Sequence, residues 1–362
     1  MSEGQAQSQS GELIARIRCL SSQLQPQPSA YPARVAVLPD IRAVIFDIYG
    51  TLLISGSGDI GPASAEQSEQ ALHEALSAAG LPVARLGDDS CAAETLVDCI
   101  QEAQTVRRAE GIEFPEVDII AVWRQVLSKL FEQDQNLAIK DSQLRRLAVE
   151  YECRTNPVWP MPGMRDTLDT LHAAGRQLGI VSNAQFYTPL MFRALLDATP
   201  DELGFDPRLC VWSYEALQGK PSVTLFQQVL NELAGVHGIS PQQTLYVGND
   251  MLKDIWPAAR LGCKTALFAG DRRSLRLRED DERCRGLATR RSSSNAGSKS
   301  VDEYGSVRST DPKGDRRYRQ RGAHCPFLPQ EPTGGCSHCA PTSRSRPTVR
   351  PPDWYVAAVR NR

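Results

Sequence analysis

The sequence predicts an α/β protein with a doubly wound parallel sheet, and three short apolar segments carry this prediction. They span residues 43–46, 177–181 and 244–247, and are built largely from Ile, Val, Leu and aromatic residues. Such runs are typical of strands that helices cover on both faces, as in a parallel sheet. Each run ends in polar residues. Because open α/β sheets bind ligands outside the carboxyl ends of their strands, we expect the functional site there.

The first strand carries the most informative feature. Its apolar residues stop at Asp47, and Gly50 and Thr51 then let the chain turn away. A carboxylate at this position faces a substrate rather than the core.

Three further motifs follow along the chain. The second strand ends in Ser182 and Asn183, a hydroxyl and an amide. Lys220 and a proline precede an amphipathic helix with Leu225, Phe226, Val229 and Leu230 on one face. The last of the three strands ends in Gly248, Asn249 and Asp250, and Asp254 follows four residues later.

A nucleophilic Asp, a hydroxyl, a Lys and an acidic pair, in this order and each at a strand end, resemble the four motifs of the haloacid dehalogenase-like (HAD) hydrolase superfamily. The resemblance covers roughly residues 40–280. It implies a Rossmann-like HAD core in residues 35–53 and 162–283. A helical cap is expected in residues 54–161, inserted between the first and second motifs.

The residue types predict hydrolysis through a covalent aspartyl intermediate, with Asp47 as nucleophile. Thr51, Ser182, Asn183 and Lys220 offer donors and positive charge to an anionic group. For a phosphate ester, Mg²⁺ is the expected cofactor. Its predicted ligands are Asp47, the backbone carbonyl of Tyr49, and either Asp250 or Asp254.

Tyr49 departs from the phosphatase pattern. Most phosphatases of the superfamily have there a second Asp, which protonates the leaving group, and a phenol is a poor substitute near neutral pH. Asp-x-Tyr-Gly-Thr is similar to the first motif of the 2-haloacid dehalogenases, whose halide leaves without a proton. Those enzymes place a Tyr six residues after the motif Lys, however, and this chain has Phe226.

Asn249 is the second departure, because it replaces the usual Asp after Gly248. We favour Mg²⁺-dependent hydrolysis of a small phosphate monoester, with Tyr49 in the catalytic set. One alternative is dehalogenase-type cleavage of a carbon–halogen bond. Another is a non-catalytic binding protein of the same fold.

The stretch before the second motif predicts four helices, at residues 65–79, 93–108, 118–131 and 144–153. A lid of this kind excludes water and brings specificity residues onto the substrate. Arg107, Arg108 and Arg124 are candidates to bind a substrate carboxylate or phosphate.

Both ends of the chain differ in composition from this middle. We expect residues 1–34 to be a flexible leader despite an apolar patch that includes Leu13 and Ile17. Residues 285–362 contain 15 Lys and Arg against 6 Asp and Glu, within a chain whose total charge is −2. This composition predicts a disordered tail over residues 284–362.

The tail allows four interpretations: a solvated tail without a partner, weak binding of nucleic acid or an anionic surface, a metal site around Cys336 and Cys339, and an out-of-frame continuation of the gene. With no long apolar segment, we expect a cytoplasmic protein without membrane contact. A small anionic molecule is the expected substrate, and the sequence does not indicate an oligomeric state.

Overall fold

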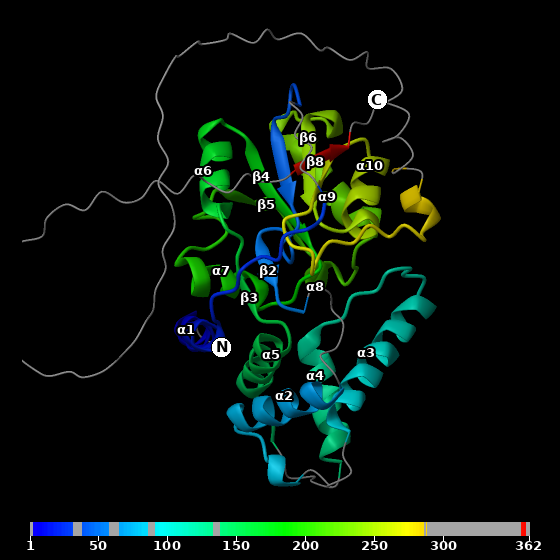
Figure 1. Cartoon of the computed structure of the whole chain (residues 1–362). Coiled ribbons are helices and arrows are strands. Elements are labelled where there is room, and N and C mark those ends of the chain that lie inside the picture. Colours follow the sequence, from blue (N-terminus) through cyan, green and yellow to red (C-terminus); the bar gives the residue numbers. More distant parts are fainter. Residues whose placement is uncertain are drawn as a thin grey trace, which may run out of the picture. The chain divides into compact units, whose positions relative to one another are not determined.

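A six-stranded sheet forms the centre of the computed structural model, which describes residues 3–31, 38–57, 65–85, 91–132, 138–285, 287 and 356–359. The strand order is β5-β4-β1-β6-β7-β8, with β1 in the middle. The first five strands are parallel to their neighbours, and β8 is antiparallel to β7. Figure 1 shows this sheet. The bounds are β1 Ala43–Phe46, β4 Gln177–Ser182, β5 Phe205–Trp212, β6 Thr244–Gly248, β7 Lys264–Phe268 and β8 Val356–Val359.

Alternate residues of β1 belong to different cores. Val44 and Phe46 pack into the larger hydrophobic cluster, whereas Ala43 and Ile45 pack into a second one with residues of α9. Figure 1 shows α6 and α7 on one side of the sheet and α9 and α10 on the other. The predicted doubly wound parallel sheet is therefore confirmed. These helices and the short α8 span Met164–Ala173 (α6), Thr188–Leu196 (α7), Ser213–Ala216 (α8), Val223–His237 (α9) and Trp256–Arg260 (α10).

Four helices lie in the chain between β2 (Leu53–Ser55) and β3 (Val158–Pro160), which pair as a small antiparallel sheet. They are α2 Ala65–Ala78, α3 Ala92–Ala109, α4 Ile119–Leu130 and α5 Asp141–Thr155. All four were predicted from their apolar spacing, and the structure confirms them as helices. We call this part of the chain the helical insertion. Short turns of helix complete the structure: η1 Val83–Arg85, η2 Pro241–Gln243 and the π-helical η3 Met251–Ile255.

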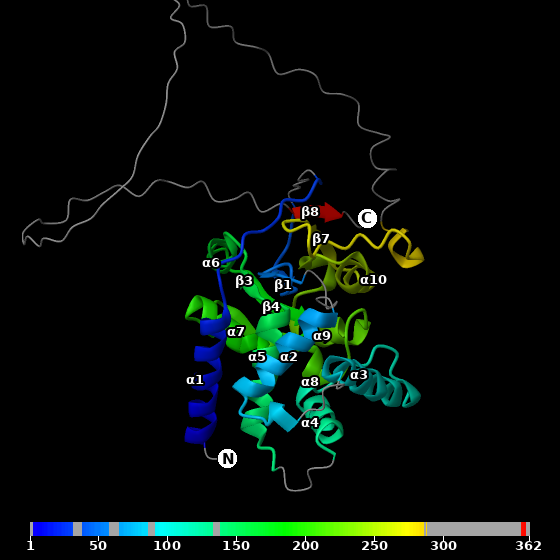
Figure 2. The same ribbon diagram turned by 60° about the horizontal axis from the view of Figure 1, so that its bottom comes forward.

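The expected flexible leader is wrong for most of its length. Glu3–Leu20 form helix α1, which packs against α5 of the insertion and α7 of the core. Leu13 and Ile17 are buried there, and Arg16 binds Glu150 on α5. Figure 2 shows α1 beside α7 and α5. The apolar patch is buried against α5 and α7, and this burial offsets the entropy lost when the segment is ordered.

The predicted disorder of the tail is wrong for residues 356–359. Their backbone pairs with β7 as the antiparallel edge strand β8. Cys336 and Cys339, to which one interpretation of the tail assigns a metal site, lie outside the described residues. Within the part of the chain that the structure describes, no helix is both long and apolar enough to span a bilayer.

Candidate functional site

The register of three strands brings the predicted motifs together. Phe46 of β1 is level with Ile180 of β4 and with Val247 of β6. Asp47, Ser182 and Gly248 therefore follow at one edge of the sheet, as parallel strands require.

Lys220 joins two of the predicted carboxylates. Its Nζ donates to Asp47 Oδ1 at 2.7 Å and to Asp254 Oδ1 at 2.5 Å. The Ser182 hydroxyl also donates to Asp47 Oδ1, at 2.8 Å. One oxygen of Asp47 is thus held by two donors, and no described residue hydrogen-bonds to Oδ2.

The opposite charges of this buried cluster stabilise one another. Burial opposes the charge of Lys220, but Asp254 and Asp47 outweigh it and raise the pKa of the ammonium. Burial also raises the pKa of Asp254 to about 6, against the effect of Lys220. Lys220 therefore stays charged at neutral pH and holds Asp47 in a fixed orientation.

Two glycines allow the motifs to approach this closely. A Cβ on Gly50, whose φ is +83°, would lie 2.4 Å from Ser274 Cβ. A Cβ on Gly248 would lie 2.4 Å from Asp254 Cγ. Only glycine fits at these two positions.

Thr51 and Ser182 form hydrogen bonds inside the protein, whereas Asn183 also reaches the cavity. The Thr51 hydroxyl donates to Asn249 Oδ1 at 3.0 Å, and both Thr51 and Ser182 are fully buried. Asn183 Oδ1 accepts from the backbone N–H of Lys220 at 2.7 Å, and Asn183 also lines a cavity. Asn183 and Lys220 therefore face the cavity, whereas the hydroxyls of Thr51 and Ser182 bond to Asn249 and Asp47.

The two carboxylates predicted as metal ligands already have partners. Asp250 caps η3 through the N–H groups of Leu252 and Lys253, and it forms an ion pair with Arg278 at 2.7 Å. Asp254 Oδ2 accepts from the Asp250 N–H at 2.9 Å, while its Oδ1 binds Lys220. Among the described residues no group of three or more His, Cys, Asp and Glu side chains could hold a metal ion. The expectation for Asp250 and Asp254 therefore lacks support in this geometry.

Oxygen donors suited to Mg²⁺ are nevertheless present beside Asp47. Among the described residues, Thr51 alone donates to Asn249 Oδ1, and an amide oxygen can bind a second partner. Both Asn249 and Asp47 line the cavity. Mg²⁺ typically takes one or two protein carboxylates and completes its shell with water and substrate phosphate. The residues fit such a site, with Asp47 as its single available carboxylate.

Tyr49 lines the cavity, and protein groups engage its hydroxyl. Its hydroxyl forms a hydrogen bond with Thr188 Oγ1 at 2.9 Å and contacts Met191 Sδ at 3.5 Å. Burial, and after it the charge of Glu152, raise the pKa of Tyr49 well above its ordinary value. The phenol therefore stays neutral at neutral pH.

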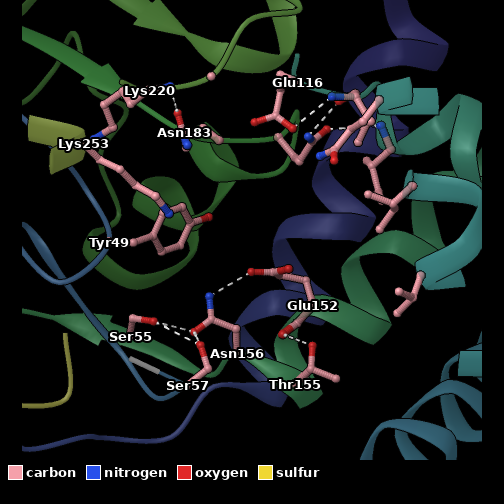
Figure 3. Close-up of a pocket in the computed structure, with 18 of the residues that line it drawn as sticks. Tyr49, Ser55, Ser57, Glu116, Glu152, Thr155, Asn156, Asn183, Lys220 and Lys253 are labelled. Atoms are coloured by element: carbon pink, nitrogen blue, oxygen red, sulfur yellow. Dashed lines mark hydrogen bonds between the residues drawn. The ribbon is translucent and has the colours of Figure 1, made fainter. Parts of the chain in front are cut away.

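A cavity of about 1030 Å³ opens over these motifs and extends to the helical insertion. Sequence reasoning missed several of its lining residues, among them Glu116, Glu152, Asn156 and Lys253. Figure 3 shows Glu152 and Asn156 across the cavity from Lys220 and Lys253. Burial raises the pKa values of both Glu116 and Glu152. The helix pattern alone could not identify Glu152, because it does not show which polar face of a helix meets a cavity. Glu116 lies in the loop before α4.

The chain is similar in sequence to a family of hydrolases and to named phosphatases. A family model described as haloacid dehalogenase-like hydrolase matches residues 41–262. Phosphoglycolate phosphatase of Salmonella typhi is 29% identical over 236 residues, which cover 62% of this chain and 80% of that protein. The Escherichia coli O157:H7 enzyme of the same name is 30% identical over 234 residues, or 62% of this chain and 79% of that protein. Among solved structures, a 2-haloacid dehalogenase from Pseudomonas syringae pv. Tomato DC3000 aligns with a TM-score of 0.44 and 21% identity, over 63% of this chain and 86% of that chain.

Proposed function

Because the chain belongs to the haloacid dehalogenase-like hydrolase family, we propose that it hydrolyses small phosphate monoesters with Asp47 as the nucleophile. The observation that carries the proposal is the arrangement around Asp47. Lys220 and Ser182 hold Oδ1, so that Oδ2 is the oxygen available to a substrate. The curated relatives named above act on a phosphate ester by name, which supports this choice of reaction.

The reaction has two steps. Oδ2 of Asp47 attacks phosphorus, the bond to the ester oxygen breaks, and the alcohol leaves with that electron pair and takes a proton from solvent. Water then attacks the aspartyl phosphate, releases inorganic phosphate and restores Asp47. Lys220 offers fixed positive charge beside the transferred group, and Asn183 lies next to it on the cavity wall.

Mg²⁺ is the proposed cofactor, and Asp47, the Tyr49 backbone carbonyl and Asn249 Oδ1 would hold it. When bound, the ion supplies positive charge that offsets the charge of the phosphoryl oxygens. This ligand set replaces Asp250 and Asp254, whose oxygens Arg278, Lys220 and backbone N–H groups already engage.

We propose that the helical insertion acts as the cap of this site. The cavity over Asp47 is lined by residues of α3, α4 and α5 as well as by the core motifs. Such a cover would exclude water from the reacting groups and contact the alcohol part of the substrate.

One observation favours a second candidate, hydrolysis of 2-haloacids. Tyr49 is neutral and bonded to Thr188, so this position supplies no carboxylic acid to protonate a leaving alkoxide. A halide leaves without a proton and does not need that acid.

Phosphate release from a panel of phosphate monoesters, with Mg²⁺ and with EDTA, tests the proposal. The Asp47→Asn variant is the control, because its side chain keeps the shape but loses the nucleophile. Release that depends on both Asp47 and Mg²⁺ supports the phosphatase. Halide release from 2-haloacids without phosphate release would overturn it in favour of the second candidate.

A further inference from the structure

Glu152 is a half-buried carboxyl group in the wall of the cavity opposite the core motifs. It lies on α5, and its Oε2 accepts from the Tyr187 hydroxyl at 2.9 Å. Its Oε1 accepts from Asn156 Nδ2 at 3.0 Å. Each carboxylate oxygen can accept a second hydrogen bond, so the group retains capacity for a ligand donor.

The neighbours of Glu152 are polar but carry no counter-charge. Asn156 Oδ1 accepts from the hydroxyls of Ser55 and Ser57, at 2.7 and 2.9 Å. Within the described part of α5, Glu152 is the one charged residue among those that line the cavity. Figure 3 shows this group of side chains together.

The cations of the cavity lie elsewhere. Lys220, Lys253 and Arg276 line it from the core. Two arginines that the sequence offered for a substrate carboxylate have other partners, since Arg107 pairs with Glu110 and Arg124 with Asp141. Arg108 lines the cavity from α3, where it is exposed and donates to Gln104.

We propose that Glu152 selects the alcohol part of the substrate, favouring phosphate esters whose alcohol carries an ammonium or hydroxyl donor and disfavouring those that carry a carboxylate. The inference rests on the proposed phosphatase function and adds the substrate class. The phosphate would lie beside Lys220 and Asp47, and the donor would reach toward Glu152. A substrate carboxylate in that place meets like charge and, among the described side chains bonded to Glu152, no cation.

Three esters of similar size separate these cases: O-phosphoethanolamine with an ammonium, glycerol 1-phosphate with hydroxyls, and phosphoglycolate with a carboxylate. We expect wild-type kcat/KM to be higher for the first two than for phosphoglycolate. The Glu152→Gln variant keeps the shape and loses the charge, so the phosphoethanolamine-to-phosphoglycolate ratio should fall about 10- to 100-fold. The ratio of kcat/KM for glycerol 1-phosphate to that for phosphoglycolate should fall less, because a hydroxyl carries no charge.

Glu116→Gln is the matched control. Glu116 is a second half-buried carboxyl of the cavity wall, and it accepts a hydrogen bond from the Ser213 hydroxyl at 2.8 Å. Its substitution should leave the ratio within about threefold of wild type. An equal fall in both variants would show a general effect of cavity charge and overturn the assignment to Glu152, as would a wild-type preference for phosphoglycolate.

Binding separates failure of this inference from failure of the proposed function. Dissociation constants of the same three esters, measured by calorimetry on Asp47→Asn with and without Glu152→Gln, report selection without turnover. Asp47-dependent hydrolysis of all three esters with no preference would retain the phosphatase and overturn the role of Glu152. If no ester is hydrolysed, the order of the three dissociation constants still supports or overturns that role.

Discussion

Arg16 of α1 and Glu150 of α5 are joined by two hydrogen bonds, from Nε to Oε1 at 2.6 Å and from Nη2 to Oε2 at 2.9 Å. The Glu150 side chain is fully buried, and Arg154 also binds it at 2.6 Å. The contact fastens α1 to the helical insertion, while Arg18 binds Asp197 at the end of α7 in the core. Helix α1 thereby links the insertion to the core.

We expect Glu150→Gln to lower the free energy of unfolding by about 1.5–3 kcal/mol, the value of a hydrogen bond to a charged group. Chemical denaturation of the full chain measures this change. Glu202→Gln is the control, because Glu202 forms an exposed pair with Arg193 and should change stability by less than about 1 kcal/mol. Equal effects would contradict a special role of the buried contact.

The contribution of Glu150 to the free energy of unfolding should decrease as pH falls. Burial alone would raise its pKa, but Arg16 and Arg154 outweigh this, so the pKa is lowered from its ordinary value of 4.5. A carboxyl group with a lowered pKa in the folded state stabilises the fold above pH 4.5, and the gain is lost as pH falls through the folded value. The stability difference between wild type and Glu150→Gln should therefore shrink below about pH 4.5. A difference that grew on acidification would be inconsistent with the ion pair.

Lys220→Met should abolish activity and also destabilise the fold. It leaves Asp47 and Asp254 buried without their shared cation, and breaking a buried pair costs about 3–5 kcal/mol. Thermal unfolding and phosphate release measure the two effects. Lys129→Met serves as the control, since Lys129 forms an exposed pair with Glu102 and should lose less than about 1 kcal/mol. Wild-type stability of Lys220→Met would show that the cluster does not hold the strand ends together.

The predictable part of this molecule is the part that local sequence determines. Apolar runs that stop at Asp47, at Ser182 and after Val247 identify strands and their polar ends, so the cluster around Lys220 followed from the sequence. Glu152 did not, because its importance comes from the packing of α5 over the cavity. Helix α1 was missed since it buries few apolar side chains, among them Leu13 and Ile17. The four-residue strand β8 was missed because its pairing with β7 joins segments about 90 residues apart, at a distance that local patterns do not report.

Tyr49→Phe should change kcat/KM by less than about threefold, far below the 10²–10⁴ expected for loss of a general acid. The hydroxyl is bonded to Thr188 and its pKa is raised, so its removal costs mainly one neutral hydrogen bond, about 1 kcal/mol of stability. Steady-state kinetics on an ester with a poor leaving group is the sensitive measurement. A loss of 100-fold or more would restore Tyr49 to the catalytic set predicted from the sequence.

Asn249→Asp should strengthen Mg²⁺ binding and lower the stability of the metal-free protein. Asn249 Nδ2 donates to the Ser274 carbonyl at 2.6 Å, and a carboxylate would place an acceptor against an acceptor there. We expect a loss of about 1–3 kcal/mol in stability without metal.

With Mg²⁺ bound, the substitution should be favourable instead of unfavourable, because a carboxylate replaces an amide among the proposed ligands of a divalent cation. The half-saturating Mg²⁺ concentration for phosphate release should fall about tenfold. Added Mg²⁺ should also raise the melting temperature of this variant more than that of wild type. Asp250→Asn provides the comparison: Asp250 caps η3 and pairs with Arg278, so its loss should lower stability and leave the half-saturating concentration unchanged. A half-saturating Mg²⁺ concentration that rises in Asp250→Asn and stays unchanged in Asn249→Asp would return the metal-ligand role to Asp250, as the sequence predicted.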